Sequence, residues 1–137
     1  MFFRRPVKEE RVVIQADVIR SLHSTNHVTV IPSPGRGKAI EVISANVQTV
    51  TGNTPLAFTG SLGLLAGGIG TSRAQRILVA PVINSQFDQW ACMTPGETHG
   101  SLMENEAIKF GPIVGANVAH NADTDVIVDV MYRVVEA

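Results

Sequence analysis

The fold is decided by the stretch His27–Val47, which reads HVTVIPSPGRGKAIEVISANV. Both of its ends are rich in β-branched residues that alternate with polar or small ones, a pattern typical of strands with one buried face. Between them Pro32 and Pro34 fix φ and remove two amide donors, and Gly35 and Gly37 can take the positive φ that a sharp reversal requires. We therefore predict two strands joined by a rigid structural corner.

The strand predicted over Lys38–Val50 changes phase in its middle. Its apolar residues fall on one face up to Val42 and on the other face from Ile43 onward. A β-bulge inserts one extra residue and so restores the facing of a strand whose pattern has slipped. We predict such a bulge near Val42–Ser44, which would direct both halves of the strand into one core.

Short apolar stretches bounded by Gly, Pro and Asn predict further strands on both sides of this one. We predict strands over Arg11–Ile14, His27–Ile31, Leu56–Ala66 with interruptions at Gly60 and Gly63, Arg76–Ala80, Ser101–Phe110, Ile113–Val118 and Val126–Val135. The last strand is the most regular, with a predicted buried face made of Val126, Val128, Val130, Tyr132 and Val134 and an outer face that holds Asp125, Asp129 and Arg133. Turns or loops are predicted at 51–55, 93–100, 111–112 and 120–124.

Helical signals are few. Ile14, Val18 and Leu22 recur at intervals of four residues, and Asp17 stands where a first helical turn favours an acidic residue. The stretch Val82–Trp90 is ambiguous and favours helix. The chain is therefore predicted to be all-β, a β-sandwich or jelly-roll-like fold with at most one or two short helices. An extended N-terminal arm, residues 1–10, is predicted to precede a single domain over residues 11–137.

The composition of the chain disfavours several classes of function. The chain has 137 residues, of which 45% are hydrophobic and only 17% charged, with a net charge of −1. This balance argues against a basic groove for nucleic acid, and a surface so poor in charge predicts oligomerisation or docking onto a larger assembly. The single cysteine, Cys92, excludes an intrachain disulfide and fits assembly in the cytosol. The sequence contains no signal-peptide core and no stretch long enough to span a membrane.

Candidate chemical sites are weak throughout the sequence. Gly35-Arg36-Gly37-Lys38 lacks the first glycine and the following helix of a phosphate-binding loop. His23 and His27 have the spacing of a helical metal pair, although the second of them belongs to a predicted strand. Neither Cys92 nor the carboxylates of the last strand have a catalytic context. We predict no enzymatic activity, no catalytic residues, no metal site and no cofactor.

The arm is the feature that most favours a functional interpretation. Its sequence MFFRRPVKEER combines apolar anchors with guanidinium donors. Such a segment can lie in a groove of a neighbouring subunit and become ordered as it binds. The residues predicted to contact a capsid or another partner are Phe2, Phe3, Arg4, Arg5, Lys8 and Arg11.

The order of several motifs resembles one family, the small virion structural proteins of tailed bacteriophages. The similar features are the amphipathic start VIQADVIRSLHST, a strand that ends in Pro, the turn Pro34-Gly35-Arg36-Gly37-Lys38, the sequence Phe58-Thr59-Gly60 and a last strand with Tyr132 and Val134. The resemblance extends over most of Arg11–Val135, whereas Leu62–Cys92 and Thr94–Phe110 match nothing in the family.

The resemblance implies a β-sandwich subunit of the phage particle, most often a head decoration (cement) protein. It implies binding to the major capsid protein on the outer capsid surface, assembly as a homotrimer in the host cytoplasm, and no nucleic-acid or membrane partner. The alternative is a tail, fibre or adhesin-type module that binds a host surface ligand through the loops Gly67–Ser72 and Met93–Gly100.

Overall fold

A computed structural model describes residues 6–22, 26–52, 58–59, 62–66, 75–79, 89–95, 103–112, 117–118 and 123–136 of the chain. The elements are β1 (Lys8–Ile14), α1 (Ala16–Arg20), β2 (Val28–Ile31), β3 (Lys38–Thr51), β4 (Phe58–Thr59), β5 (Leu62–Ala66), β6 (Gln75–Val79), β7 (Gln89–Cys92), β8 (Thr94–Pro95), β9 (Ile108–Pro112), β10 (Asn117–Val118) and β11 (Thr124–Glu136).

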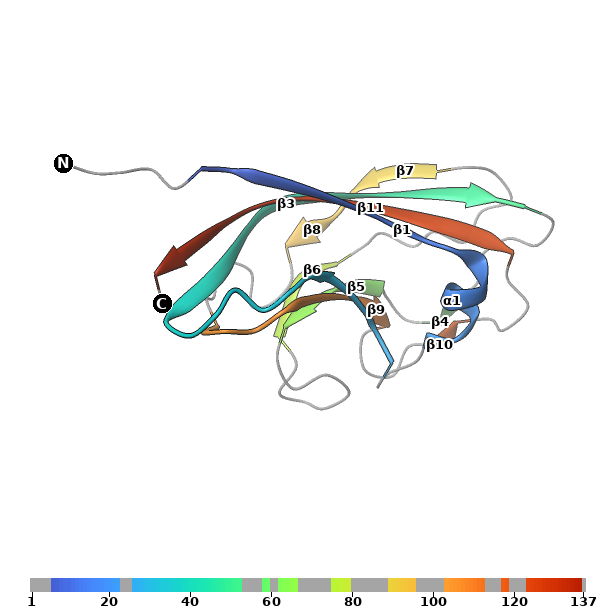
Figure 1. Ribbon diagram of the computed structural model, residues 1–137. Coiled ribbons are helices and arrows are strands. Elements are labelled where there is room, and N and C mark those ends of the chain that lie inside the picture. The colour runs from blue at the N-terminus through green and yellow to red at the C-terminus, as the bar shows by residue number, and fades with distance from the viewer. Residues whose placement is uncertain are drawn as a thin grey trace.

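The strands form two facing layers (Figure 1). A four-stranded sheet has the order β1-β11-β3-β7, and a five-stranded sheet has the order β2-β9-β5-β6-β8. A separate two-stranded pair joins β10 to β4, and every described pairing is antiparallel. The prediction of an all-β sandwich with one short helix in the described part is confirmed.

The pairing of β3 with β11 is the longest among the described residues and contains the predicted bulge. Met131 pairs with Ser44, whereas the next residue of β11, Tyr132, pairs with Val42, so that Ile43 is the extra residue. On both sides of the bulge the core-facing residues of β3 are buried, from Val42 at 6% exposure to Val47 at 1%. The bulge therefore aligns both halves of β3 with one core, as the phase change predicts.

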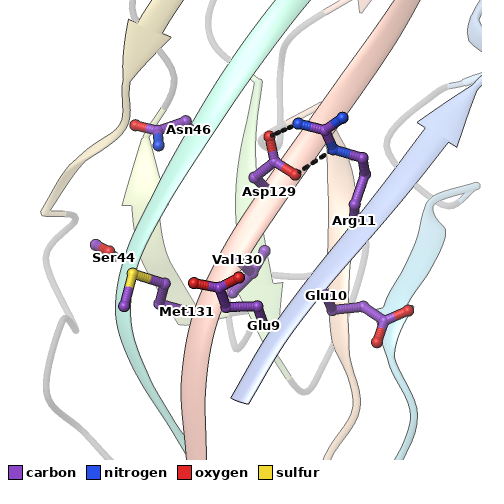
Figure 2. Close-up of a pocket in the computed structure, with 8 residues that line it drawn as sticks. All are labelled: Glu9, Glu10, Arg11, Ser44, Asn46, Asp129, Val130 and Met131. Carbon is purple, nitrogen blue, oxygen red and sulfur yellow. Dashed lines mark hydrogen bonds and ion pairs between the residues drawn. The ribbon is translucent and has the colours of Figure 1, made fainter. Parts of the chain in front are cut away.

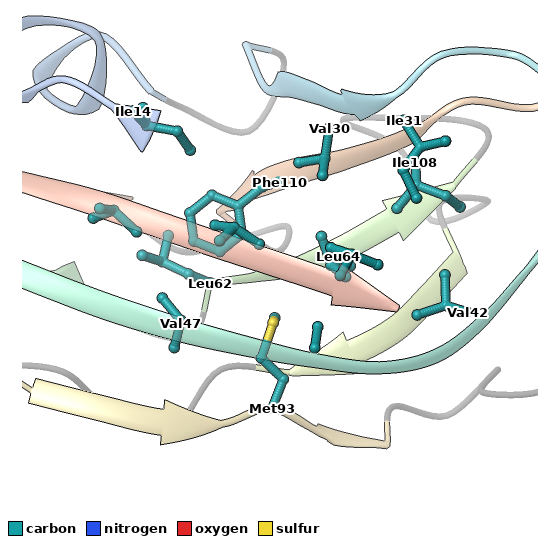
Figure 3. Packing of buried hydrophobic residues seen from close by; sticks show 14 of the residues in the cluster. Ile14, Val30, Ile31, Val42, Val47, Leu62, Leu64, Met93, Ile108 and Phe110 are labelled. Atoms are coloured by element: carbon teal, nitrogen blue, oxygen red, sulfur yellow. The ribbon is translucent and has the colours of Figure 1, made fainter. Parts of the chain in front are cut away.

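The core lies between the two sheets (Figure 3). Phe110 from β9 and Leu64 from β5 are completely buried and meet Val128 and its neighbours from β11. Burial of one such side chain is worth roughly 1.5–3 kcal/mol. Among the described residues, Phe110 is the aromatic ring buried in this core and most of its neighbours are aliphatic, so the packing depends on many contacts between small side chains.

The corner carries the chain from one layer to the other, since β2 belongs to the five-stranded sheet and β3 to the four-stranded sheet. Gly35 has φ 110° and Gly37 has φ 77°, the positive values that the sequence predicts. The backbone N–H of Gly35 donates to Asn105 Oδ1 at 3.0 Å, and that of Gly37 donates to Glu104 Oε1 at 2.8 Å. Two side chains from a distant segment thus fix the corner.

Several predicted boundaries are wrong for identifiable reasons. The strand predicted over Ser101–Phe110 begins only at Ile108 within the described residues. Before it, Glu104 forms a single bridge to Ala39 of β3, and Glu104 and Asn105 bind the corner, so no continuous ladder forms there. Gly111 and Pro112 are part of β9 and not a turn, since they pair with β5. The 93–100 loop contains the short strand β8, and Gly63 lies inside β5 without interrupting it.

The remaining differences concern the helix and the ends of strands. Of the predicted apolar residues, Ile14 and Leu22 are buried, but Val18 is 40% exposed, and Ile19 is the buried residue of α1 in its place. Gln89 and Trp90, at the end of the stretch expected to be helical, belong to β7, and residues 82–88 lie outside the described part. Val134 is only half-buried, because β11 extends beyond the core at its end.

Candidate interaction surface

Large apolar side chains are exposed at three places on the described outer face of the four-stranded sheet. Val13 of β1 is 55% exposed, Val50 of β3 is 41% exposed and Met131 of β11 is 39% exposed. These residues alternate with the core-facing positions of their strands, which places them on the side of the sheet that faces away from the sandwich. The register spreads them along the sheet, with Val50 opposite Asp125 and Met131 opposite Ser44, so each could add a separate apolar contact to a partner on this face.

A hollow of about 480 Å³ lies on this face, across β1, β11 and β3 (Figure 2). The sheet register builds it from two rows of side chains. The first row consists of Glu9, Met131 and Ser44, and the second row consists of Arg11, Asp129 and Asn46. Glu10 and Val130 complete the lining.

Arg11 and Asp129 form a two-pronged ion pair inside the hollow. Arg11 Nε lies 2.7 Å from Asp129 Oδ1, and Arg11 Nη2 lies 3.1 Å from Asp129 Oδ2. The hydrogen bond to Asp129, and secondly the attraction of its charge, raise the pKa of Arg11 above its ordinary value. Because Arg11 is 65% exposed, solvent screens the pair, which contributes little to stability. Its main effect is to fix two side chains across β1 and β11.

The charge of the hollow is negative. The side chains that face it include the carboxylates of Glu9 and Asp129 and the guanidinium of Arg11. Glu10 pairs with the core-facing Val130, so its side chain points away from the hollow (Figure 2). Because Arg11 neutralises Asp129, the exposed Glu9 gives the hollow its negative charge. Charged residues on an edge strand also oppose uncontrolled pairing with other strands.

The predicted contact residues divide into two groups. Phe2, Phe3, Arg4 and Arg5 lie outside the described residues. Lys8 and Arg11 belong to β1, which begins three residues before the predicted strand and includes Lys8–Glu10 from the predicted arm. Lys8 is exposed at the start of this edge strand, and Arg11 is bound to Asp129.

The structure also assigns contacts that the sequence does not reveal. Asp125 Oδ1 accepts a hydrogen bond from the backbone N–H of Ala16 at 2.8 Å, so this carboxylate caps α1 and is not simply solvated. Only the tertiary fold brings β11 to the start of α1, and no local sequence signal marks the pair. The same holds for Glu104 and Asn105 at the corner.

The weaker chemical candidates acquire no support from the described residues. His23 lies outside them, and His27 Nε2 bonds to the carbonyl oxygen of Pro112 at 2.8 Å. Within the described ranges no group of three His, Cys, Asp or Glu residues could hold a metal ion. Gly35–Lys38 leads into β3 and not into a helix, and Cys92 is exposed. None of the described helices is long and apolar enough to cross a membrane.

Comparison with known proteins adds one structural relative. No protein-family model and no curated protein matches the sequence. A chain in the solved structure entitled "Capsid of Ralstonia phage GP4" superposes on this one with a TM-score of 0.50 and 13% sequence identity. The match covers 93% of this chain and 84% of that chain. The two chains share a fold.

Proposed function

We propose that this protein is a non-enzymatic structural protein of a phage virion, a decoration or cement protein that binds the outer surface of the capsid. The observation that carries the proposal is the shared fold with a chain of a phage capsid structure over 93% of the length. The ordered sequence motifs, from the amphipathic start to the Tyr132–Val134 end, support the same assignment independently of that superposition. The partners are the major capsid protein and further copies of this chain, assembled as a homotrimer.

The mechanism of a cement protein follows from linked equilibria. A subunit that binds the assembled shell, but not its dissociated subunits, stabilises the shell by mass action. Such a mechanism requires binding contacts and no catalysis. The described surface offers exposed apolar side chains and a hollow with charges of both signs. The protein needs only a stable scaffold and complementary contacts.

Two measurements test the proposal. Purified protein is incubated with phage heads that lack it, and bound protein is quantified by co-sedimentation; we expect saturable binding and heads that resist heat better. Electron microscopy of the intact virion should then show its density on the outer capsid surface. Density in the tail, or no binding to heads, would contradict the proposal and favour the tail or adhesin module. Its expected loop Gly67–Ser72 lies outside the described residues, and Met93–Gly100 is described only to Pro95.

A further inference from the structure

We propose that residues 1–5 of one copy bind the outer face of the four-stranded sheet of a neighbouring copy, in the hollow between β1, β11 and β3. The inference deepens the proposed function, on which it rests only for the assembly of the chain with itself. It names the two surfaces that form the contact between copies.

The chemistry of the segment complements that of the hollow. Residues 1–5 read MFFRR, two aromatic rings followed by two guanidinium groups. The hollow offers the carboxylate of Glu9, and Met131 lies between Glu9 of β1 and Ser44 of β3 with 39% of its surface exposed. Arginine binds carboxylates with two parallel hydrogen bonds, and thioethers make favourable contacts with aromatic rings. The Arg11–Asp129 pair shows that this face accommodates a guanidinium in such a geometry.

The size of the site fits part of the segment. Sites for small molecules have volumes of about 300–1,000 Å³, so the hollow of about 480 Å³ can hold one or two large side chains, and the rest of the segment would lie across the sheet. The exposed Val13 lies on the same face of β1 as Glu9 and Arg11, and it would extend the contact beyond the hollow. An aromatic anchor followed by charged contacts at the rim is the arrangement found in many protein interfaces.

The arm of the same copy is poorly placed to fill this site. The β1 part of the hollow begins at Glu9, one residue after the strand starts at Lys8. The chain would therefore have to reverse between Pro6 and Lys8, yet Pro6 and Val7 form neither a turn nor a bend. A second copy supplies the segment without any reversal.

Charge reversal tests the contact in the full-length protein. One variant carries Arg4→Glu and Arg5→Glu, and the other carries Glu9→Lys, the unpaired carboxylate that faces the hollow. Self-association is measured for each by sedimentation velocity, with circular dichroism to establish that both are folded. We expect each variant alone to associate on the order of tenfold more weakly than the wild type, because each places like charges against one another. Mixing the two variants should restore association, since the acidic arm of one then meets the basic hollow of the other.

The control is Arg36→Glu, which reverses an exposed charge at the corner, away from the hollow, and should associate like the wild type. A monomeric wild type, unchanged association of both charge variants, or a mixture that associates no better than its components would each overturn the inference. Because these measurements use no capsids, they remain distinct from the head-binding test. A protein that self-associates through its arm and yet fails to bind heads would contradict the proposed function alone.

Discussion

Glycine serves two different purposes in this molecule. Gly35 and Gly37 have positive φ, and a Cβ atom at either position would meet nothing within 4 Å. At Gly111, by contrast, a Cβ atom would lie 2.3 Å from Cδ2 of His27. The first two are needed for the backbone conformation, and the third is needed for space. A substitution at Gly35 or Gly37 should therefore be tolerated according to how well the new residue adopts positive φ, and one at Gly111 according to how much space His27 leaves.

The corner provides the first prediction. Gly37→Ala should lower the free energy of unfolding by about 1–2 kcal/mol, the usual cost of the left-handed conformation for a residue with a Cβ atom. Gly37→Asn should cost less, because asparagine tolerates that conformation and φ here is 77°. At Gly35, with φ 110°, asparagine should have no such advantage, so Gly35→Ala and Gly35→Asn should lose similar stability. Chemical denaturation of the four variants measures this, and equal losses for Ala and Asn at Gly37 would contradict the explanation.

The second prediction concerns the contact between Gly111 of β9 and His27, which directly precedes β2. Gly111→Ala forces a methyl group against the His27 ring and should cost roughly 1–3 kcal/mol, as overpacking does. His27→Ala removes the ring and its bond to Pro112, and is destabilising by itself. In the double variant the clash is absent. Its loss of unfolding free energy should therefore be smaller than the sum of the losses of the two single variants. Strict additivity in a double-mutant cycle would show that steric conflict is not the cause.

At the scale of elements, β11 organises both layers and the helix. Its even-numbered residues up to Val130 face the core, and Asp125 on its opposite side caps α1, which has no side-chain cap of its own. Asp129 binds Arg11 on β1. The single strand thus fixes an edge strand and a helix through side chains on its outer face.

The cap yields the third prediction. Asp125→Ala should cost about 1 kcal/mol, the typical loss for an N-terminal helix cap. Asp129→Ala is a matched control on the same face of the same strand, and it should cost less, because Arg11 is 65% exposed and its ion pair is screened. Thermal melts of the two variants show which substitution lowers the stability more. If Asp129→Ala proves the more harmful, the ion pair and not the cap is the important contact of this face.

For the whole molecule, the sequence predicts the sandwich, the bulge at Ile43 and the positive φ of the corner, since each follows from local pattern or local stereochemistry. It does not predict that Glu104 and Asn105 brace the corner. That contact joins segments about seventy residues apart, and only the tertiary fold brings them together.

The candidate surface was accessible to sequence reasoning only in part. Arg11 was expected to contact a partner, but its bond to Asp129 depends on the register of β1 against β11, which no local signal sets. In the sequence Val13 and Met131 resemble other strand residues. Only the folded sheet shows that the core covers the opposite faces of β1 and β11 and leaves these two residues exposed. An alternating pattern identifies two faces of a strand and leaves open what each one meets.

The last prediction concerns the arm in the assembled protein. Deletion of Met1–Arg5 removes no part of β1, whereas deletion of residues 1–10 also removes the three strand residues from Lys8 to Glu10. In dilute solution the shorter deletion should melt at the wild-type temperature, and the longer one should melt at a lower temperature. Association makes Tm depend on protein concentration, so the Tm of the wild type should rise with concentration and that of the shorter deletion should not.

Added salt separates the two kinds of arm contact in the same experiment. Screening weakens the interactions of Arg4 and Arg5 with the carboxylate of Glu9 and leaves the apolar contacts of Phe2 and Phe3 intact. The concentration dependence of the wild-type Tm should therefore decrease with salt but persist. Heads bound by the shorter deletion should carry fewer copies, because subunits that no longer hold one another dissociate independently. A shorter deletion that keeps both its concentration-dependent Tm and full occupancy of heads would show that the arm contributes to neither contact.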